Sequence, residues 1–256
     1  MIDLSIVLTT YNDFENFKIT FESIINEISF DDEIIIIDSS SNDFAKKYSS
    51  SYKNVKYFFQ SPKGVFPAMN FGISLCSNQY IQIMCSGDTI IENTLNAVKE
   101  SISFNKNNFK LFVFSQVYKF DNDTSYSIHP SMNTLFPHQS VICHHTIYEK
   151  ALYPEKYFLA ADQIFFAEIR KEYDVYFEKI KFTSYDMHGL SRKVSLKNSK
   201  DIFLIYKKLD RRYIVAFFYA YILPLSRFFI EILFGKKLSF KIGFYFKKLF
   251  ISEFDY

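Results

Sequence analysis

Three aspartates occur at places in the sequence where a carboxylate can act on a ligand. Asp38 ends an apolar run and is followed by three serines, small residues that let a ligand approach closely. Asp88 comes directly after Ser86 and Gly87, beyond a second apolar run, and Asp162 follows two alanines. A carboxylate in such a place can accept hydrogen bonds from a ribose or a base, hold a divalent cation, or remove a proton from a hydroxyl group.

Each aspartate also has an ordinary structural interpretation, so none of them predicts a function by itself. Asp38 could cap a helix within a turn, and Asp88 could belong to a plain turn before a helix. Asp162 falls near a predicted helix start, where the helix dipole favours a negative charge. The order of such fragments along the chain is therefore more informative than any one of them.

The histidines and cysteines form no pattern typical of a structural zinc site. His144 and His145 are adjacent, so in a strand they point to opposite faces, and Cys76, Cys85 and Cys143 include no CxxC pair. Sparse, unpaired cysteines are typical of a reducing compartment. The sequence also lacks the GxSxG, GxGxxG and GxxxxGK[ST] motifs, which argues against the enzyme classes that depend on them.

The apolar pattern predicts the elements that must position these side chains. Runs typical of strands lie at 4–8, 33–37, 55–59, 80–84, 109–120 and 180–185. Helices are predicted after Asn12 or Asp13, over 67–75, over about 92–103 and from near Ala160, whereas about 121–137 looks like a loop.

The alternation of strands and helices predicts an α/β fold with a mostly parallel sheet. Nearly continuous apolar strands are expected when helices cover both faces of such a sheet. Ligands then bind beyond the carboxyl ends of the strands. We therefore expect Thr9, Tyr11, Asp38 and Asp88 to converge, although they are far apart in the sequence.

Taken in order, these fragments resemble the family 2 glycosyltransferases, which have the GT-A fold. The resemblance covers about residues 2–195. It rests on SIVLTTYN at 5–12, IIIIDSSSND at 34–43, Lys63 and Gly64, AMNFGI at 68–73, SGD at 86–88, His138 with Gln139, and Ala161 with Asp162. As an ordered set these motifs are fairly specific, and the SGD variant is similar to the bacterial cell-surface polysaccharide type.

The resemblance implies an inverting glycosyltransferase whose donor is a nucleotide diphosphate sugar, with UDP favoured. The first fragments would line the nucleoside pocket, and the segment after Lys63 would shape the donor site near the sugar and the diphosphate. The donor-binding residues implied in this way are Thr9, Tyr11, Asn12, Asp38, Lys63, Gly64 and Asn70.

The same resemblance implies the metal site and the catalytic base. Asp88 looks like the surviving acid of the DxD-type motif and would hold Mn²⁺ or Mg²⁺, with His188 near the diphosphate as a looser match. Asp162 looks like the base that deprotonates the acceptor hydroxyl. The chain departs from the family pattern at Ser39, Ser86 and Pro67, so a catalytically inactive module that binds a nucleotide sugar is the alternative.

Composition and charge divide the chain into a body and a tail. With 256 residues, 48% of them apolar, the chain is long enough for one large α/β domain with an appendage. Ten Lys or Arg and two acidic residues fall within 207–248, although the net charge of the whole chain is only +2. We therefore predict a GT-A domain over 1–206 and an amphipathic, basic, aromatic helical tail over 207–256.

The tail is expected to lie in the membrane interface or to pack on the domain. The uncharged stretch 213–225 is shorter than the about 20 residues that span a bilayer, and Pro224 interrupts it. Aromatic residues mixed with Lys and Arg are typical of interfacial helices. Since the first residues do not resemble a signal peptide, we expect a cytoplasmic enzyme, peripheral on the inner face of a bacterial plasma membrane, near a polyprenyl-linked glycan acceptor.

Two other classes fit the sequence less well. A nucleic-acid-binding protein would use the basic tail, but the body offers no recognised motif. A nucleotidyltransferase would need a glycine-rich, basic phosphate loop near the N-terminus, and Thr9 to Asn12 do not form one. We therefore expect no nucleic acid partner.

Overall fold

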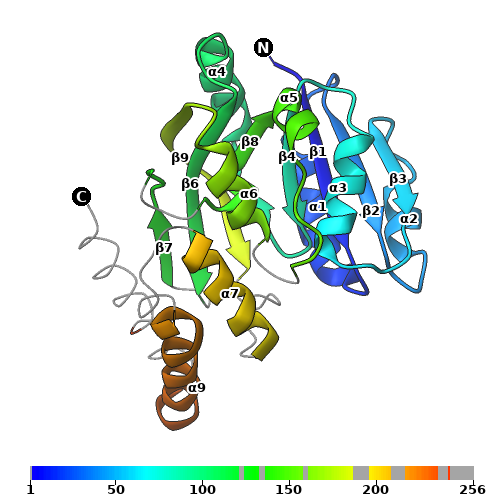
Figure 1. The fold of residues 1–256 in the computed structure, drawn as a ribbon. Helices are drawn as coiled ribbons and strands as arrows, with labels where there is room; N and C mark the ends of the chain where they lie inside the picture. The colour runs from blue at the N-terminus through cyan, green and yellow to red at the C-terminus, as the bar shows by residue number, and fades with distance from the viewer. Residues whose placement is uncertain are drawn as a thin grey trace.

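The structure is a computed structural model of the chain (Figure 1). It describes residues 2–120, 124–132, 136–157, 161–186, 196–208, 217–235 and 242. His188, the looser of the two predicted metal-site residues, lies outside the described residues.

The first half of the chain forms the parallel part of the sheet. Its elements, in chain order, are β1 (Leu4–Thr10), α1 (Phe14–Ile25), β2 (Glu33–Asp38), α2 (Phe44–Ser49), β3 (Val55–Phe59), α3 (Val65–Ser74) and β4 (Tyr80–Cys85). β1 pairs in parallel with β2 on one side and with β4 on the other, and β2 pairs in parallel with β3. The predicted alternation of strands and helices is confirmed here, with ends shifted by a few residues.

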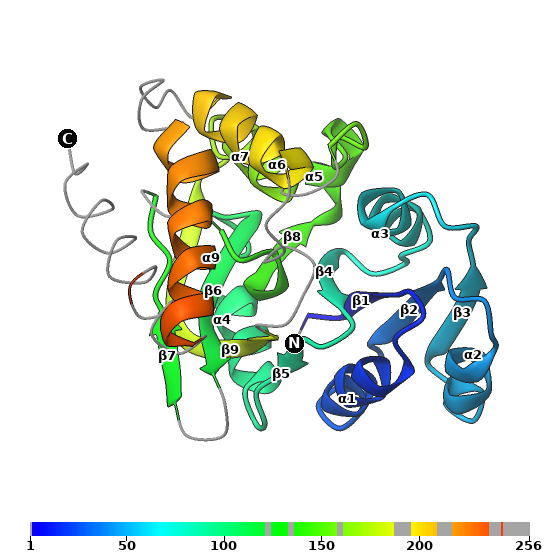
Figure 2. The ribbon, with the colours of Figure 1, turned by 90° about the horizontal axis from the view of Figure 1, so that it is seen from below.

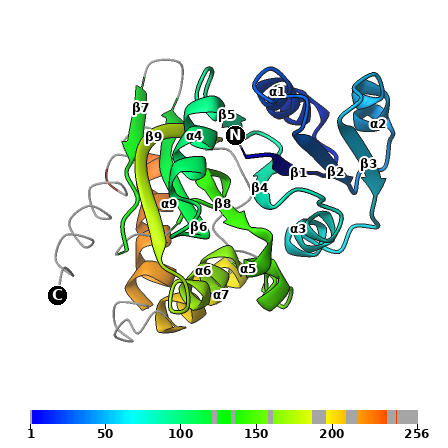
Figure 3. The same ribbon diagram turned by 90° about the horizontal axis from the view of Figure 1, so that it is seen from above.

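Helices cover both faces of this parallel part, as the apolar strands predict. α1 and α2 lie on one face and α3 on the other (Figures 2 and 3). Because neighbouring strand residues point to opposite faces, Val7 packs in the cluster that includes Phe66 of α3, whereas Leu8 packs with Phe17 and Phe21 of α1. All seven residues of β1 are buried, so the sheet separates two hydrophobic cores.

The second half of the chain extends the sheet with antiparallel pairs. Its elements are β5 (Thr89–Ile90), α4 (Leu95–Asn105), β6 (Leu111–Phe120), β7 (Thr124–Ile128), the 3₁₀ turn η1 (His138–Ser140), β8 (Val141–His144), α5 (His145–Lys150), α6 (Ala161–Ile169) and β9 (Val175–Asp186). The strand order is β3-β2-β1-β4-β8-β6-β9-β5, with β7 on β6. β8 runs antiparallel to both β4 and β6. The whole is therefore a mixed α/β fold.

One expectation from the sequence is wrong in this half. The segment 121–137, which looks like a loop, contains β7, which pairs antiparallel with Gln116 to Phe120 of β6. The sequence of β7 is TSYSI. A strand with so few apolar residues does not show the alternation by which strands are recognised, and its pairing with β6 is a tertiary contact.

The last described elements are helical, and the first of them packs against α6. They are α7 (Leu196–Lys208), the π-helical turn η3 (Phe218–Ile222) and α9 (Leu223–Phe234). The boundary predicted between residues 206 and 207 falls inside the last turn of α7. Phe203 of α7 contacts Tyr221 with ring centroids 6.2 Å apart, and Ala220 and Leu223 are buried. α9 thus packs through its first turn and through η3.

The rest of α9 presents apolar side chains to solvent. Its exposed large apolar residues are Leu225, Phe228, Phe229, Ile232 and Leu233. Within the described part of the chain, no helix is both long enough and apolar enough to cross a membrane.

Candidate active site

The carboxyl ends of β1 and β2 meet, as the parallel sheet requires. Thr10 lies opposite Asp38 in the register of the two strands. Asp38 is fully buried; its Oδ1 accepts the Ser40 N–H at 2.8 Å, and its Oδ2 accepts the Tyr57 hydroxyl at 3.0 Å. Burial and this hydrogen bond raise the pKa of Tyr57. Asp38 therefore shapes the turn that follows β2, at the edge of the sheet where the sequence predicts donor binding.

Asn12 joins the two loops at this edge of the sheet. Its backbone takes a positive φ of 49°, a conformation that asparagine tolerates better than most residues. The Asn12 N–H donates to Ser40 Oγ at 2.8 Å, and its side-chain oxygen accepts the Ser41 N–H at 2.9 Å. The loop after β1 is thereby fixed to the loop after β2. Tyr11, next to this joint, is 58% exposed, so its ring is available to a ligand.

Asp88 lies in the turn between β4 and β5. Gly87 has a φ of 101°, which favours glycine, and the Gly87 N–H donates to Thr20 Oγ1 of α1 at 2.8 Å. Asp88 is only 3% exposed, and Gln139 Nε2 donates to its Oδ2 at 2.9 Å. The Gln139 amide is oriented in turn by Gln116, whose Nε2 donates to Gln139 Oε1 at 3.0 Å. The carboxylate is thus held in one direction.

Asp162 enters the site from the first turn of α6. Its Oδ2 lies 3.3 Å from His138 Nδ1 and accepts Gln163 Nε2 at 2.9 Å. Burial would lower the pKa of His138, but hydrogen bonds to Asp162 and Cys85 outweigh burial and hold that pKa well above its ordinary value. His138 and Gln139 are consecutive residues of η1, so a single turn holds both the Asp88 and the Asp162 carboxylates.

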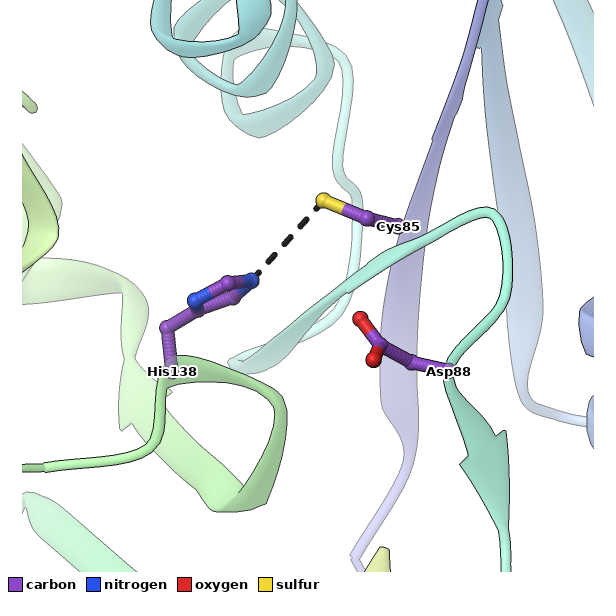
Figure 4. Close-up of side chains that lie close together, drawn as sticks. All are labelled: Cys85, Asp88 and His138. Carbon is purple, nitrogen blue, oxygen red and sulfur yellow. Dashed lines mark hydrogen bonds between the residues drawn. The ribbon is translucent and has the colours of Figure 1, made fainter. Parts of the chain in front are cut away.

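Cys85, the last residue of β4, completes a compact group of polar side chains. Its Sγ lies 3.8 Å from His138 Nε2 and accepts the Thr9 hydroxyl at 3.4 Å. Ligand atoms of Cys85, Asp88 and His138 all lie within 4.8 Å of one another (Figure 4). A carboxylate, an imidazole and a thiol can all bind divalent metal ions, and the carboxylate suits Mg²⁺ or Mn²⁺. The donor set therefore fits a divalent cation.

The remaining predicted donor residues lie to one side of this group, at the start of α3. Lys63 and Gly64 line a half-open hollow of about 160 Å³, together with Glu155, Lys156 and Tyr157. Gly64, with a φ of 117°, adopts a conformation that side chains rarely allow. The hollow thus lies between α3 and the segment before α6, next to the predicted donor site.

Asn70 contacts protein rather than open space. Its Nδ2 donates to the Tyr153 carbonyl at 2.9 Å and to Glu155 Oε1 at 3.0 Å, and its Oδ1 accepts the Tyr153 N–H at 3.0 Å. The side chain is 7% exposed. Asn70 therefore ties α3 to the segment that forms the other wall of the hollow, and its direct contact with a donor stays a prediction.

Sequence reasoning gave no role to Cys85, His138 or Gln139. His138 and Gln139 belong to the ordered motifs, and this membership is the only feature of the sequence that indicates that they lie in the site. Their contacts with Asp88 and Asp162 join positions that are 51 and 24 residues apart. Nothing in the spacing of Cys85 and His138 indicates that they meet.

Comparison with protein families gives a match over most of the chain. The family model described as Glycosyl transferase family 2 matches residues 5–195, which is more than half of the chain.

Two curated relatives match shorter segments. A cholesterol galactosyltransferase from Borreliella burgdorferi is 29% identical over 96 residues, which is 36% of this chain and 26% of the relative. An uncharacterized glycosyltransferase, YibD, from Escherichia coli is 31% identical over 91 residues, which is 34% of this chain and 26% of the relative. The matched segments thus span about a quarter of each relative's length.

Solved structures match almost the whole chain at low identity. S. aureus TarS 1-349 in complex with UDP-GlcNAc has a TM-score of 0.64 at 13% identity, covering 94% of this chain and 76% of that one. The mannosyltransferase PcManGT from Pyrobaculum calidifontis, in complex with GDP-Man and Mn²⁺, has a TM-score of 0.64 at 10% identity, covering 96% and 79%. At such identities the likeness shows the fold, which is GT-A.

Proposed function

We propose that this chain, which belongs to glycosyl transferase family 2, is a glycosyltransferase that transfers a sugar from a nucleotide diphosphate sugar to a glycan hydroxyl. UDP is the favoured nucleotide, and the acceptor is a glycan or lipid-linked glycan of a surface polysaccharide. UDP, UDP-GlcNAc and GDP-Man are bound by the proteins of similar fold, which supports a nucleotide-sugar donor here.

One observation carries the proposal. The two carboxylates implied in the reaction, Asp88 and Asp162, are held by consecutive residues of η1. Both are buried or nearly so, and the loops after β1 and β2 lie at the same edge of the sheet. A nucleotide diphosphate sugar whose nucleoside lies over those loops would direct its diphosphate toward Asp88 and its sugar toward Asp162.

In the proposed reaction Asp162 acts as the general base. Its carboxylate removes the proton of an acceptor hydroxyl while that oxygen attacks the anomeric carbon from the face opposite the diphosphate. A new glycosidic bond forms, the bond to the diphosphate oxygen breaks, and the configuration inverts. His138 orients the Asp162 carboxylate, and Gln139 orients that of Asp88. A divalent cation at Asp88 would neutralise the charge of the leaving diphosphate.

Calorimetry tests the donor site directly. The purified protein is titrated with UDP, GDP and CDP, with and without Mn²⁺. We expect one nucleotide, UDP, to bind in a metal-dependent manner and Asp88→Asn to weaken that binding at least about 10-fold, since a carboxylate ligand is lost. Asp31→Asn, which neutralises an exposed carboxylate away from the site, serves as the matched control.

The outcomes separate the proposal from its alternative. No binding of any diphosphate to the folded protein would contradict the donor site. Metal-dependent binding of UDP without hydrolysis or transfer of any UDP-sugar tested, in wild type and in Asp162→Asn alike, would favour the inactive binding module instead.

We also propose that the tail, residues 207–256, docks the enzyme on the inner face of the plasma membrane. Two observations support this: the apolar side chains that α9 exposes and the excess of Lys and Arg over 207–248. Each basic residue near anionic lipid contributes about 1 kcal/mol. Docking would bring the active site near a polyprenyl-linked acceptor.

A further inference from the structure

Cys85, His138 and Asp88 offer a set of ligands that Mg²⁺ and Mn²⁺ do not require. Hard cations are satisfied by carboxylate, carbonyl and water oxygens, whereas thiolate and imidazole favour softer ions such as Zn²⁺. The three side chains come from the end of β4, from η1 and from the turn after β4, and they converge on one space (Figure 4).

The distances suit a tetrahedral ion. Zn–S bonds of about 2.3 Å and Zn–N bonds of about 2.1 Å place sulfur and nitrogen about 3.6 Å apart on one ion. Cys85 Sγ and His138 Nε2 are 3.8 Å apart. The third ligand atom, a carboxylate oxygen of Asp88, lies within 4.8 Å of both. Small side-chain rotations therefore bring all three atoms onto one ion.

Each of the three ligands is oriented by a neighbour, as the ligands of metal sites usually are. His138 Nδ1 lies 3.3 Å from Asp162 Oδ2, which directs Nε2 toward Cys85. Gln139 donates to Asp88 at 2.9 Å, and Thr9 donates to Cys85 Sγ at 3.4 Å. A metal-binding histidine typically donates its other ring N–H to a carboxylate, and such partners change metal affinity about 10- to 100-fold.

We propose that Cys85, His138 and Asp88 form a binding site for a thiophilic divalent cation of the Zn²⁺ type, and that an ion there excludes the donor's Mn²⁺ from Asp88. Three protein ligands leave one tetrahedral position for water or a phosphate oxygen. The binding site rests on this geometry alone, whereas the competition rests on the proposed transferase function.

Cobalt tests the site without any substrate, because Zn²⁺ has no visible spectrum. The full chain is stripped of metal with a chelator, kept reduced with a phosphine, and titrated with Co²⁺. We expect a visible tetrahedral spectrum and a thiolate-to-Co²⁺ charge-transfer band, both abolished by Zn²⁺. Cys85→Ser should remove the charge-transfer band, and His138→Gln should weaken Zn²⁺ binding at least about 10-fold.

Cys76→Ser is the matched control, because Cys76 is a partly buried cysteine whose thiol contacts the Gly72 carbonyl rather than the site. It should keep the band. Absence of the band in folded wild-type protein, or its persistence in Cys85→Ser, would overturn the proposal.

A second arm measures UDP binding with Mn²⁺ in the presence and absence of Zn²⁺, and we expect Zn²⁺ to weaken it. If the cobalt bands appear as described and UDP does not bind at all, the metal site stands and the transferase function fails. If UDP binds with Mn²⁺ and no thiolate band appears, the donor site stands and the proposed Cys85 metal site fails.

Discussion

His138 and Gln139 are neighbours in the chain, yet each holds a different carboxylate of the site. At the residue scale this means that the direction of Asp88 and Asp162 depends on one short 3₁₀ turn. Ser140, the next residue of η1, hydrogen bonds to Thr183 of β9. Three consecutive polar residues of η1 therefore connect β4, α6 and β9 at the centre of the molecule.

The base role of Asp162 is tested at the same scale. Asp162→Asn keeps the shape of the side chain but cannot take the acceptor proton. Loss of a general base typically costs 10²- to 10⁴-fold, so we expect kcat for sugar transfer to fall by about that factor. UDP affinity, measured by calorimetry, should remain within about 2-fold of wild type, since the base acts only on the acceptor.

Asp174→Asn, an exposed carboxylate between α6 and β9, is the control for this variant. Full activity of Asp162→Asn would show that the base is another residue. An equal loss of UDP binding would show instead that Asp162 acts in donor binding.

At the scale of elements, α3 approaches the sheet more closely than a side chain would allow. A Cβ built on Gly72 would fall well inside van der Waals contact of Val7 Cγ1, and 3.2 Å from Ile37 Cγ1. Both neighbours are fully buried strand residues, so they cannot move into solvent. This contact fixes the depth of α3 and thus the position of Lys63 and Gly64 at its start.

We therefore expect Gly72→Ala to destabilise the protein. Overpacking of a filled core costs about 1–3 kcal/mol, more than the helix propensity gained from alanine. Urea unfolding followed by circular dichroism measures the change. Ser74→Ala, at an exposed position of the same helix, is the control. It should change the free energy of unfolding by less than about 0.5 kcal/mol. A Gly72→Ala variant as stable as this control would refute the close-packing argument.

At the scale of the whole molecule, one buried carboxylate ties four segments together. Glu33, at the start of β2, accepts hydrogen bonds from Ser5 of β1, Lys56 of β3, and both the N–H and the hydroxyl of Ser77 before β4. Burial raises the pKa of Glu33, but these bonds lower it from 4.5 to about 2 in the folded protein. Glu33 thus stabilises the parallel half of the sheet in its ionised form.

The pH dependence of stability should show this contribution. Because the folded pKa lies below the ordinary value, the stabilisation is fully present above about pH 4.5 and is lost as the pH falls toward about 2. Glu33→Gln should lower the free energy of unfolding at neutral pH by about 2 kcal/mol. The difference from wild type should shrink in acid, where both proteins carry a neutral side chain.

Unfolding in urea at a series of pH values checks this, with Glu100→Gln on the exposed side of α4 as the control. A constant difference between wild type and Glu33→Gln from neutral pH down to about pH 2 would contradict the assignment.

Membrane docking of the tail is also a property of the whole molecule. Leu233 of α9 is 69% exposed and would bury its side chain in the lipid interface. Leu233→Asp should reduce sedimentation with anionic vesicles about 10-fold, since burial of a leucine contributes about 1.5–3 kcal/mol. Phe104→Asp on α4, where Phe104 is 89% exposed, is the control because it introduces the same charge. This variant should sediment with vesicles as wild type does. An equal loss of vesicle binding in both variants would indicate a charge effect without docking.

Local pattern was enough to predict the parallel half of the fold. Apolar runs such as 33–37 predict strands, and apolar residues at helical spacing predict helices, each from a short stretch of sequence. Parallel strands then end at one edge of the sheet. The convergence of the ends of β1, β2 and β4 therefore followed from topology alone, and the structure confirms it. The weakly apolar β7 could not be predicted in this way, because its pairing with β6 decides its conformation.

The partners of the site residues were decided only by the tertiary structure. The sequence predicts that Asn70 binds the donor, which stays a prediction, and only the fold shows that its amide contacts Tyr153, 83 residues away. Cys85 and His138 meet across 53 residues, and no local pattern records such a contact. Residue types and their order determined which functional groups the chain contains. Packing of the strands decided which of these side chains lie in contact in the site. Such contacts need the tertiary structure because hydrogen bonds and metal ligation act only over a few ångströms.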